Sequence, residues 1–494
     1  MNVNDPDRLL SALALPETQT DAVTRKLCAT VYLDWRFAEF CREQLCHASM
    51  VAAAPSHGID DIAVARHAVH AYELEKLRFR RVSAGIVFFY AALALAVVEA
   101  VNGSPRGALV MALIALLFLA AGAVVNVRSE LASRRTALSL VRDQGHDPRE
   151  SAPRLSAALE KSLAERSRAN VVVYDAEIGA DNPFIGSGWR ITEAVWAPID
   201  VGTAAKDASG NPLAIRSFTA ADLHEFLIER MPGLGFEKLT AVDRLYVPGL
   251  SATKVPGLVP DPLRGPVSTV DERLVRAGVN VQGGQTRTYL CLQHVSRGGA
   301  LVVSMYVRAR LVQDRLTWET HAYVLPPLSP LLVSKVDKLP RRRNELFWDT
   351  VATHGFQGLP LVLAAPAMLL ARPFVSSEFL EQQASGRHDV KRKRDVDYGA
   401  VMVIREVVSD FGEMGFAERT DAVDYFQRLQ QGVLTATKEF LGEHNIDTSD
   451  LKTKQQHIVS MHTYNFTGDI TGPGHIFGDH GVQKHTDDPP QSGE

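Results

Sequence analysis

The sequence VSAGIVFFYAALALAVVEAVNGSPRGALVMALIALLFLAAGAVVNV, residues 82–127, contains two apolar runs separated by a short polar link. Each run, 82–101 and 107–127, is about 20 residues long, and a helix of that length crosses a hydrocarbon core of roughly 30 Å. The link 102–106 leaves room only for a tight turn. We therefore predict a transmembrane helical hairpin that enters a bilayer and returns, with both flanking regions on the same side.

Basic residues flank the membrane entry and exit of this hairpin, whereas the turn contains only Arg106. Lys and Arg favour the cytoplasmic side of a membrane, so both termini are predicted to be cytoplasmic, in the bacterial inner membrane. Glu99 lies in the last turn of the first span, where its carboxylate can reach the outer membrane interface. An acidic residue at this position is therefore little reason to predict an ion path through the membrane. The predicted membrane-interface residues are Lys76, Arg78, Arg80, Arg81, Arg128, Arg134 and Arg135.

Length and composition indicate that most of the chain forms folded domains outside the membrane. The 494 residues are 46% hydrophobic and 22% charged, and two spans occupy too little of the chain for a polytopic transporter. The net charge of -4 argues against a general nucleic-acid-binding protein. The first 20 residues lack the basic start and apolar core of a signal peptide. The chain has four cysteines, with no CxxC pair and too few for a disulfide framework, so we predict that they are reduced thiols: Cys28, Cys41, Cys46 and Cys291.

The predicted fold class is α+β, with N-terminal cytoplasmic helices, the hairpin, and a C-terminal cytoplasmic domain that contains an antiparallel sheet. Changes in periodicity and composition place the boundaries. The predicted regions are N-terminal helices (1–81), the hairpin (82–127), a helical stalk (128–168), an α+β domain (169–339), a basic or interfacial segment with helices (340–455) and a Gly/His-rich tail (456–494).

The clearest β pattern lies between residues 286 and 326. In 300–312, one alternating set contains Leu301, Val303, Met305, Val307, Ala309 and Leu311, and the other contains Ser304, Tyr306, Arg308 and Arg310. This predicts a strand with one buried face. Short links join it to flanking strands, which predicts a three-strand meander in which Cys291 is a buried apolar residue. Residues 247–270 read as a surface loop.

Helical periodicity appears on both sides of this meander. Residues 21–50 and 60–77 predict helices before the hairpin, and the second of these runs directly into the first span. Thr219 is placed to cap a helix over 219–231, and apolar spacing predicts another helix over 421–442. The run 170–173 predicts a strand, and the glycines around Ser187 predict a turn.

A basic cluster at 335–343 precedes Phe347, Trp348 and the apolar segment 359–371. That segment is too short for a third span and contains two prolines, so we consider it either an interfacial segment in the cytoplasmic leaflet or a packed core helix. The basic run 391–394 is either a lipid contact or a solvated loop. The pair Asp395 and Asp397 is best explained by capping and charge balance.

Histidines at short spacing raise the question of metal binding. His67 and His70 lie three residues apart on a predicted helix without a third ligand, so we interpret them as surface histidines. Five more histidines in the tail fit no ligand template: His457, His462, His475, His480 and His485. We predict no metal and no cofactor, and short stacking strands or disorder for the tail.

Several stretches together resemble a family of uncharacterised actinobacterial integral membrane proteins. They are LCATVYLDWRF (27–37), APSHGIDDIAVARH (54–67), NVVVYDAEIGADNPFIGSGW (170–189), TRTYLCLQHVS (286–296) and FLGEHNIDTSDL (440–451). The resemblance implies membrane location and bacterial origin, and it supplies no activity and no site residues.

No phosphate-binding, nucleophile-elbow, kinase or metalloprotease pattern is present in the sequence. The preferred hypothesis is therefore a membrane-anchored cytoplasmic binding or scaffold protein, with lipid and an unknown protein as partners and self-association through the hairpin or the tail. The alternative is a membrane-associated enzyme or ligand sensor in a stress or defence response. A deep pocket lined by converging polar groups would favour the alternative.

Overall fold

The computed structural model describes residues 21–46, 50–142, 146–177, 179, 182–233, 239–281, 283–360, 362–367, 387–392 and 394–449. The helices are α2 (Ala22–Thr30), α3 (Trp35–Cys46), α4 (Asp61–Val101), α5 (Pro105–Arg142), α6 (Ala157–Ser167), α7 (Ala220–Arg230), α8 (Glu272–Asn280), α9 (Pro330–Asp337), α10 (Arg343–Thr350), the π-helix η6 (Val351–Phe356), α13 (Ile404–Val407) and α14 (Phe416–Glu443). The strands are β1 (Val171–Tyr174), β2 (Trp189–Val195), β3 (Ile199–Asp200), β4 (Leu239–Pro248), β5 (Arg287–Ser296), β6 (Leu301–Val312) and β7 (Arg315–Leu325). The chain is therefore α+β, and the predictions for residues 1–20 and for the tail from 456 lie outside the described residues.

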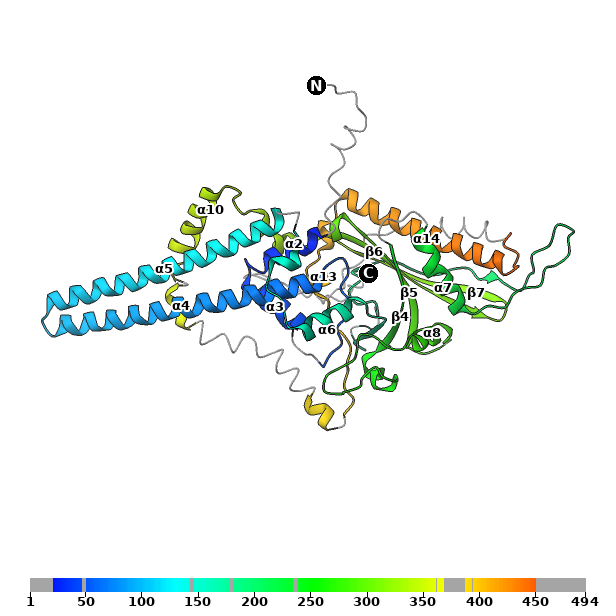
Figure 1. Cartoon of the computed structure of the whole chain (residues 1–494), viewed down its shortest axis with the longest axis horizontal. Coiled ribbons are helices and arrows are strands. Elements are labelled where there is room, and N and C mark those ends of the chain that lie inside the picture. The colour runs from blue at the N-terminus through cyan, green and yellow to red at the C-terminus, as the bar shows by residue number, and fades with distance from the viewer. Residues whose placement is uncertain are drawn as a thin grey trace, which may run out of the picture.

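The predicted hairpin is present as the distal halves of α4 and α5, which project from one end of the molecule (Figure 1). The carboxylate of Asp60 accepts hydrogen bonds from the amides of Ile62 and Ala63 and so starts α4, which continues unbroken to Val101. Both helices are long and apolar enough to cross a membrane, and only 17% and 11% of their most apolar windows are buried within the protein. The described protein therefore leaves most of this apolar surface uncovered.

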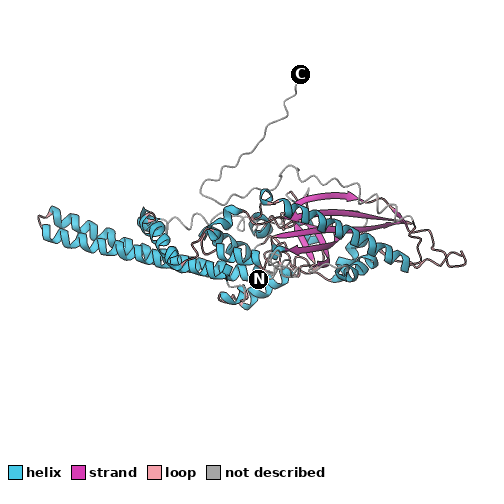
Figure 2. Cartoon of the chain, turned by 90° about the horizontal axis from the view of Figure 1, so that it is seen from above, coloured by secondary structure: helices cyan, strands magenta, loops and turns pink. Residues whose placement is uncertain are grey.

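The opposite end contains one seven-stranded mixed sheet (Figure 2). Its strand order is β1-β4-β5-β6-β7-β2, with β3 paired to β7. The predicted meander is confirmed, because β5, β6 and β7 pair in antiparallel register, with Leu292 opposite Met305 and Met305 opposite Ala322. The strand β4 lies within a region without a predicted strand, and it joins β5 antiparallel and β1 parallel.

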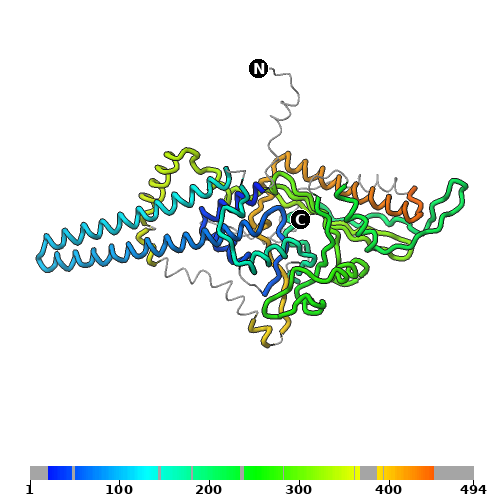
Figure 3. Tube along the Cα trace, in the orientation of Figure 1, coloured from blue at the N-terminus to red at the C-terminus, as the bar shows by residue number. Residues whose placement is uncertain are grey.

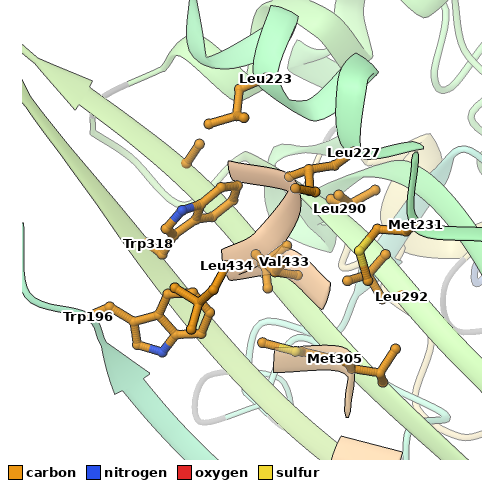
Figure 4. Packing of buried hydrophobic residues seen from close by; sticks show 14 of the residues in the cluster. Trp196, Leu223, Leu227, Met231, Leu290, Leu292, Met305, Trp318, Val433 and Leu434 are labelled. Carbon is orange, nitrogen blue, oxygen red and sulfur yellow. The ribbon is translucent and has the colours of Figure 1, made fainter. Parts of the chain in front are cut away.

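Helices α7 and α14 cover one face of the sheet (Figure 4). The apolar face predicted for β6 is buried there, and Thr219 caps α7 in a capping box with Asp222, as its position predicts. Each fully buried large apolar side chain contributes about 1.5–3 kcal/mol, so this layer is the main stabilising core of the domain. Its labelled members are Trp196, Leu223, Leu227, Met231, Leu290, Leu292, Met305, Trp318, Val433 and Leu434.

The second face of the sheet corrects a prediction from the sequence. Only one face of β6 was predicted to be buried, but Ser304, Tyr306 and Arg308 on its other face are each at most 2% exposed. The loop that carries Phe184 packs over this face, and the polar groups on it pair with one another instead of with water. Alternation alone cannot distinguish a solvated polar face from a polar face that another segment covers.

A second core connects the base of the hairpin to helices from both ends of the chain. It joins α2, α3 and α6 to the basal turns of α4 and α5, and α9 and α13 complete it. His67 lies inside this core and is fully buried, which corrects its interpretation as a surface histidine. The residue has two hydrogen-bond partners there, so it is a satisfied core side chain.

Candidate functional site

Polar and aromatic groups converge at two places, and the first is the second face of the sheet. Phe184 lies at its centre and stacks on Tyr306 with ring centroids 4.2 Å apart. Tyr246, Tyr289 and Tyr323 surround the same ring at centroid distances of 5.1, 5.0 and 5.5 Å. The four tyrosines come from four adjacent strands, so the sheet register gathers them around one inserted phenylalanine.

The loop that carries Phe184 is fastened by a buried carboxylate. Glu406 of α13 accepts hydrogen bonds from the amides of Gly186 and Gly188, each 2.9 Å long, and both glycines have positive φ. The hydroxyl of Ser187 lies 2.5 Å from that of Tyr306. The predicted turn is confirmed, and Ser187 is a buried packing residue without the surroundings of a nucleophile.

Glu319 on β7 is the charged centre of this face. It accepts hydrogen bonds from the Tyr289 hydroxyl at 2.6 Å and from His321 Nε2 at 3.2 Å. The guanidinium groups of Arg287 and Arg308 lie 3.4 and 3.5 Å away. Burial alone would raise the pKa of Glu319, but the bonds from His321 and Tyr289 and the nearby guanidinium charge hold it at about 2.

The surroundings of these side chains favour a structural cluster with constant charge states over a catalytic site. Burial raises the pKa of all four tyrosines, which therefore remain neutral at physiological pH. Burial also raises the pKa of the Cys291 thiol, as its predicted role as a small buried residue requires. A carboxylate with a pKa near 2 is a weak general base at neutral pH. Glu319 and His321 were not predicted from the sequence. Their alternation with Tyr323 along β7 could have placed all three on the same face of the sheet.

The second place is the base of the hairpin, where a segment of the C-terminal half descends along α5 (Figure 3). Arg142 donates a hydrogen bond to the carbonyl of Arg341, and further down Asn126 donates one to the carbonyl of His354. Val362 then packs against Val82 and Ile86 of α4. Residues 341–360 and 362–367 therefore run antiparallel to α5 and reach the level of the apolar runs.

An ion-pair network fastens this segment to both hairpin helices. Glu130 of α5 lies 2.6 Å from Arg78 of α4 and 3.2 Å from Arg134, and Arg134 lies 2.6 Å from Asp349 of α10. His354 of η6 contacts Arg134 at 3.0 Å and Glu130 at 3.5 Å. Burial lowers the pKa of His354. The network therefore links three segments of the chain, namely α4, α5 and the segment formed by α10 and η6.

The structure separates the predicted membrane-interface residues into three that pair with acidic side chains and four that are exposed. Arg78 and Arg134 are largely buried in the ion-pair network, and Lys76 is partly buried beside Glu73 at 4.0 Å. The remaining four are exposed at the base of the spans or just beyond it: Arg80, Arg81, Arg128 and Arg135. The interface role remains a prediction for these four, whereas Arg78 and Arg134 have protein partners.

The described residues contain no group of three or more His, Cys, Asp or Glu side chains arranged to hold a metal ion. Asp397 accepts hydrogen bonds from the amides of Ala176 and Gly399, whereas the following helix α13 begins after Val403 without a side-chain cap, so Asp397 holds two loops together and does not cap a helix. One surface cavity of about 470 Å³ lies between α5 and α10, and another of about 210 Å³ lies between α7, α8 and β6. Neither is lined by Glu319 or His321.

Comparison with known proteins identifies one family. The model of the AbeC-like domain matches residues 189–478, which include β2 to β7 and α14. No curated protein and no solved structure matches the chain. The resemblance drawn from the sequence is thus supported at the level of a protein family, whereas actinobacterial origin and membrane nature remain predictions.

Proposed function

This chain belongs to the family defined by the AbeC-like domain, and from that premise we propose that it is a membrane-anchored binding or scaffold protein. In this proposal, the hairpin spans the bacterial inner membrane and holds the sheet domain at the cytoplasmic surface. The protein has no catalytic role in this account. Its partners are the lipid bilayer and a cytoplasmic protein, and further copies of the chain associate through the hairpin or the tail.

The observation that carries the proposal is the uncovered apolar surface of the hairpin. Leu113, Leu116 and Leu117 on α5 are 55%, 62% and 69% exposed, and α4 presents similar residues. Moving each such side chain from water into lipid is favourable by about 1.5–3 kcal/mol. A surface of this size on a water-exposed hairpin would be unstable, and a bilayer provides the missing apolar environment.

Residues 359–360 and 362–367 support the same placement. The Tyr90 hydroxyl donates a hydrogen bond of 3.4 Å to the carbonyl of Leu363, and Val362 packs beside Gly122. Because Tyr90 and Gly122 lie within the apolar runs, we propose that this segment enters the cytoplasmic leaflet beside the hairpin. The exposed Trp348 on α10 is then near the membrane surface, where tryptophan is common.

The polar cluster on the sheet favours binding over catalysis. Its groups point toward one another and toward Phe184, and their shifted pKa values hold them in their ordinary charge states. Such a cluster stiffens the sheet, as a scaffold requires. The alternative, a membrane-associated enzyme or ligand sensor, needs a site elsewhere in the chain. Reproducible turnover by the full-length protein on a broad substrate panel would refute the non-enzymatic proposal.

Membrane fractionation tests the anchor directly. A triple variant with Leu113→Asn, Leu116→Asn and Leu117→Asn is expected to move from the carbonate-resistant membrane pellet to the soluble or aggregated fraction. The matched control changes three exposed apolar residues of the domain, Val195→Asn, Leu331→Asn and Phe416→Asn. The control variant is expected to remain in the pellet. Wild-type protein that carbonate releases from membranes would exclude a spanning hairpin.

A further inference from the structure

Arginine side chains dominate the lining of the cavity between α5 and α10. Its volume is about 470 Å³, within the range of roughly 300–1,000 Å³ that small-molecule sites occupy. Arg135 and Arg142 lie about two turns apart on α5, whereas Arg343 begins α10 and Arg341 lies two residues before it. Ser139 adds a hydroxyl, and the remaining described lining residues are Leu138 and Leu346.

These positive charges have no anion opposite them among the described residues. No acidic residue is among the described lining residues, and Arg135, Arg341 and Arg343 form no ion pair with a described acid. Arg142 donates a hydrogen bond to the carbonyl of Arg341, which fixes the two walls of the groove to each other. Four guanidinium groups around one concave surface repel one another, and a bound anion would reverse that penalty.

We propose that this groove binds the phosphoryl groups of a dissolved, multiply charged phosphate ligand. Guanidinium groups match phosphate oxygens with paired N–H donors, which a single lysine ammonium cannot do. Guanidinium groups from opposite walls can engage more than one phosphoryl group. Leu138 and Leu346 give the same groove an apolar side for the remainder of the ligand.

The distance of the groove from the end of the apolar run favours a dissolved ligand over an ordinary phospholipid. Arg135 and Arg142 lie eight and fifteen positions beyond Val127, which is about 12 and 22 Å along the helix axis. Headgroups extend roughly 5–8 Å beyond the hydrocarbon core on each side. This step rests on the proposed membrane anchoring, whereas the charge argument does not depend on it.

The test uses the full chain in nanodiscs of neutral phosphatidylcholine, with tripolyphosphate as the soluble probe and calorimetry as the readout. We expect saturable binding that weakens as salt is added, because the contacts are partly exposed ion pairs. The double variant Arg135→Gln and Arg341→Gln should bind at least tenfold more weakly. Arg135→Lys and Arg341→Lys together should give an intermediate affinity, because charge is retained and paired donation is lost.

The matched control is Arg264→Gln with Arg273→Gln, which removes the same charge from exposed positions remote from the groove. It should bind like the wild type. Equal weakening in this control and the groove variant would overturn the proposal, as would binding to discs with phosphatidylglycerol but not to tripolyphosphate. Unchanged unfolding temperatures without ligand confirm that the variants are folded. Failure of the wild-type chain to enter nanodiscs would refute the anchor, and tripolyphosphate binding would then be measured in solution.

Discussion

Single side chains on the second face of the sheet determine whether that face is stable. Glu319 is 14% exposed and is the counter-charge for Arg308, which is 2% exposed. Arg308 also donates a hydrogen bond to the carbonyl of Val281, so its cation is held from two sides. Removing one partner of such a pair leaves an uncompensated buried charge, which costs more than the pair contributes.

Replacing Glu319 with Gln should therefore destabilise the protein by about 3 kcal/mol, measured by urea unfolding at pH 7. The control Glu225→Gln removes a carboxylate that pairs with Arg276 at an exposed position, and it should cost less than about 1 kcal/mol. The stability that Glu319 provides is fully present above about pH 4.5 and is lost as the pH falls toward 2. Similar losses in both variants would contradict this account.

Gly188 tests the tight fit of the loop that holds Phe184. A methyl group at this position would lie 2.4 Å from the carbonyl oxygen of Val324. Gly210 has the same φ of +84° and open space around it. Gly210→Ala should thus pay only the conformational cost of about 1 kcal/mol, whereas Gly188→Ala should lose at least twice that. Unfolding curves that shift equally would disprove the steric explanation.

His67 should make the helical core sensitive to mild acid. Burial lowers its pKa from 6.5 to about 4, and the ring lies 3.0 Å from the Tyr32 hydroxyl and 2.9 Å from the carbonyl of Pro148. The unfolded chain takes up a proton on this residue below pH 6.5 and the folded chain only near pH 4. Stability is therefore present above pH 6.5, and up to about 3 kcal/mol is lost as the pH falls to 4.

The variant His67→Gln retains a donor and an acceptor but cannot titrate. Its unfolding temperature should fall less than that of the wild type when the pH is lowered from 7.5 to 4.5. The other acid-sensitive groups are common to both proteins, so the difference isolates His67. Parallel pH profiles would show that His67 does not cause the acid sensitivity.

Whole elements show which structures the sequence patterns can predict. The two long apolar helices α4 and α5, the helices α7 and α14, and the β5–β7 meander have strong local periodicity, and each is confirmed as an element of the fold. The strand β4 lacks such a signal, because its core half is buried on both faces and its partner β1 is distant in the chain. The ion pairs of Glu130 and the cluster around Glu319 were not predicted, since they join residues that only the tertiary fold brings together.

The segment formed by α10, η6 and residues 359–360 and 362–367 should depend on the ion-pair network at Glu130. Glu130→Gln removes the carboxylate shared by Arg78, Arg134 and His354, so the docked segment should open more often. Hydrogen exchange in 343–355 should rise at least tenfold, measured by mass spectrometry. The control Glu165→Gln affects only an exposed pair with Lys161 and should leave exchange in 343–355 unchanged. Unchanged exchange in Glu130→Gln would show that apolar packing alone holds the segment.

In the whole molecule, two cores share one long axis. The helical core at the base of the hairpin contacts the sheet domain where Gly58 approaches Gly299, at a distance that leaves no room for a side chain. The buried guanidinium of Arg405 donates to the carbonyls of Gly299, Ala300 and Pro326 at the same junction, and burial lowers its pKa to about 9. This close junction would transmit the orientation of the hairpin to the sheet domain.

The most direct test of the account is the sidedness of two engineered cysteines in intact bacterial cells. Asn102→Cys lies in the exposed turn of the hairpin, and Ser209→Cys lies in an exposed loop of the sheet domain. Native Cys28, Cys41 and Cys291 are buried, and Cys46 is replaced by serine in both variants. A membrane-impermeant maleimide should label position 102 in intact cells and position 209 only after permeabilisation. Labelling of position 209 in intact cells, or of position 102 only after permeabilisation, would contradict a hairpin that anchors a cytoplasmic domain.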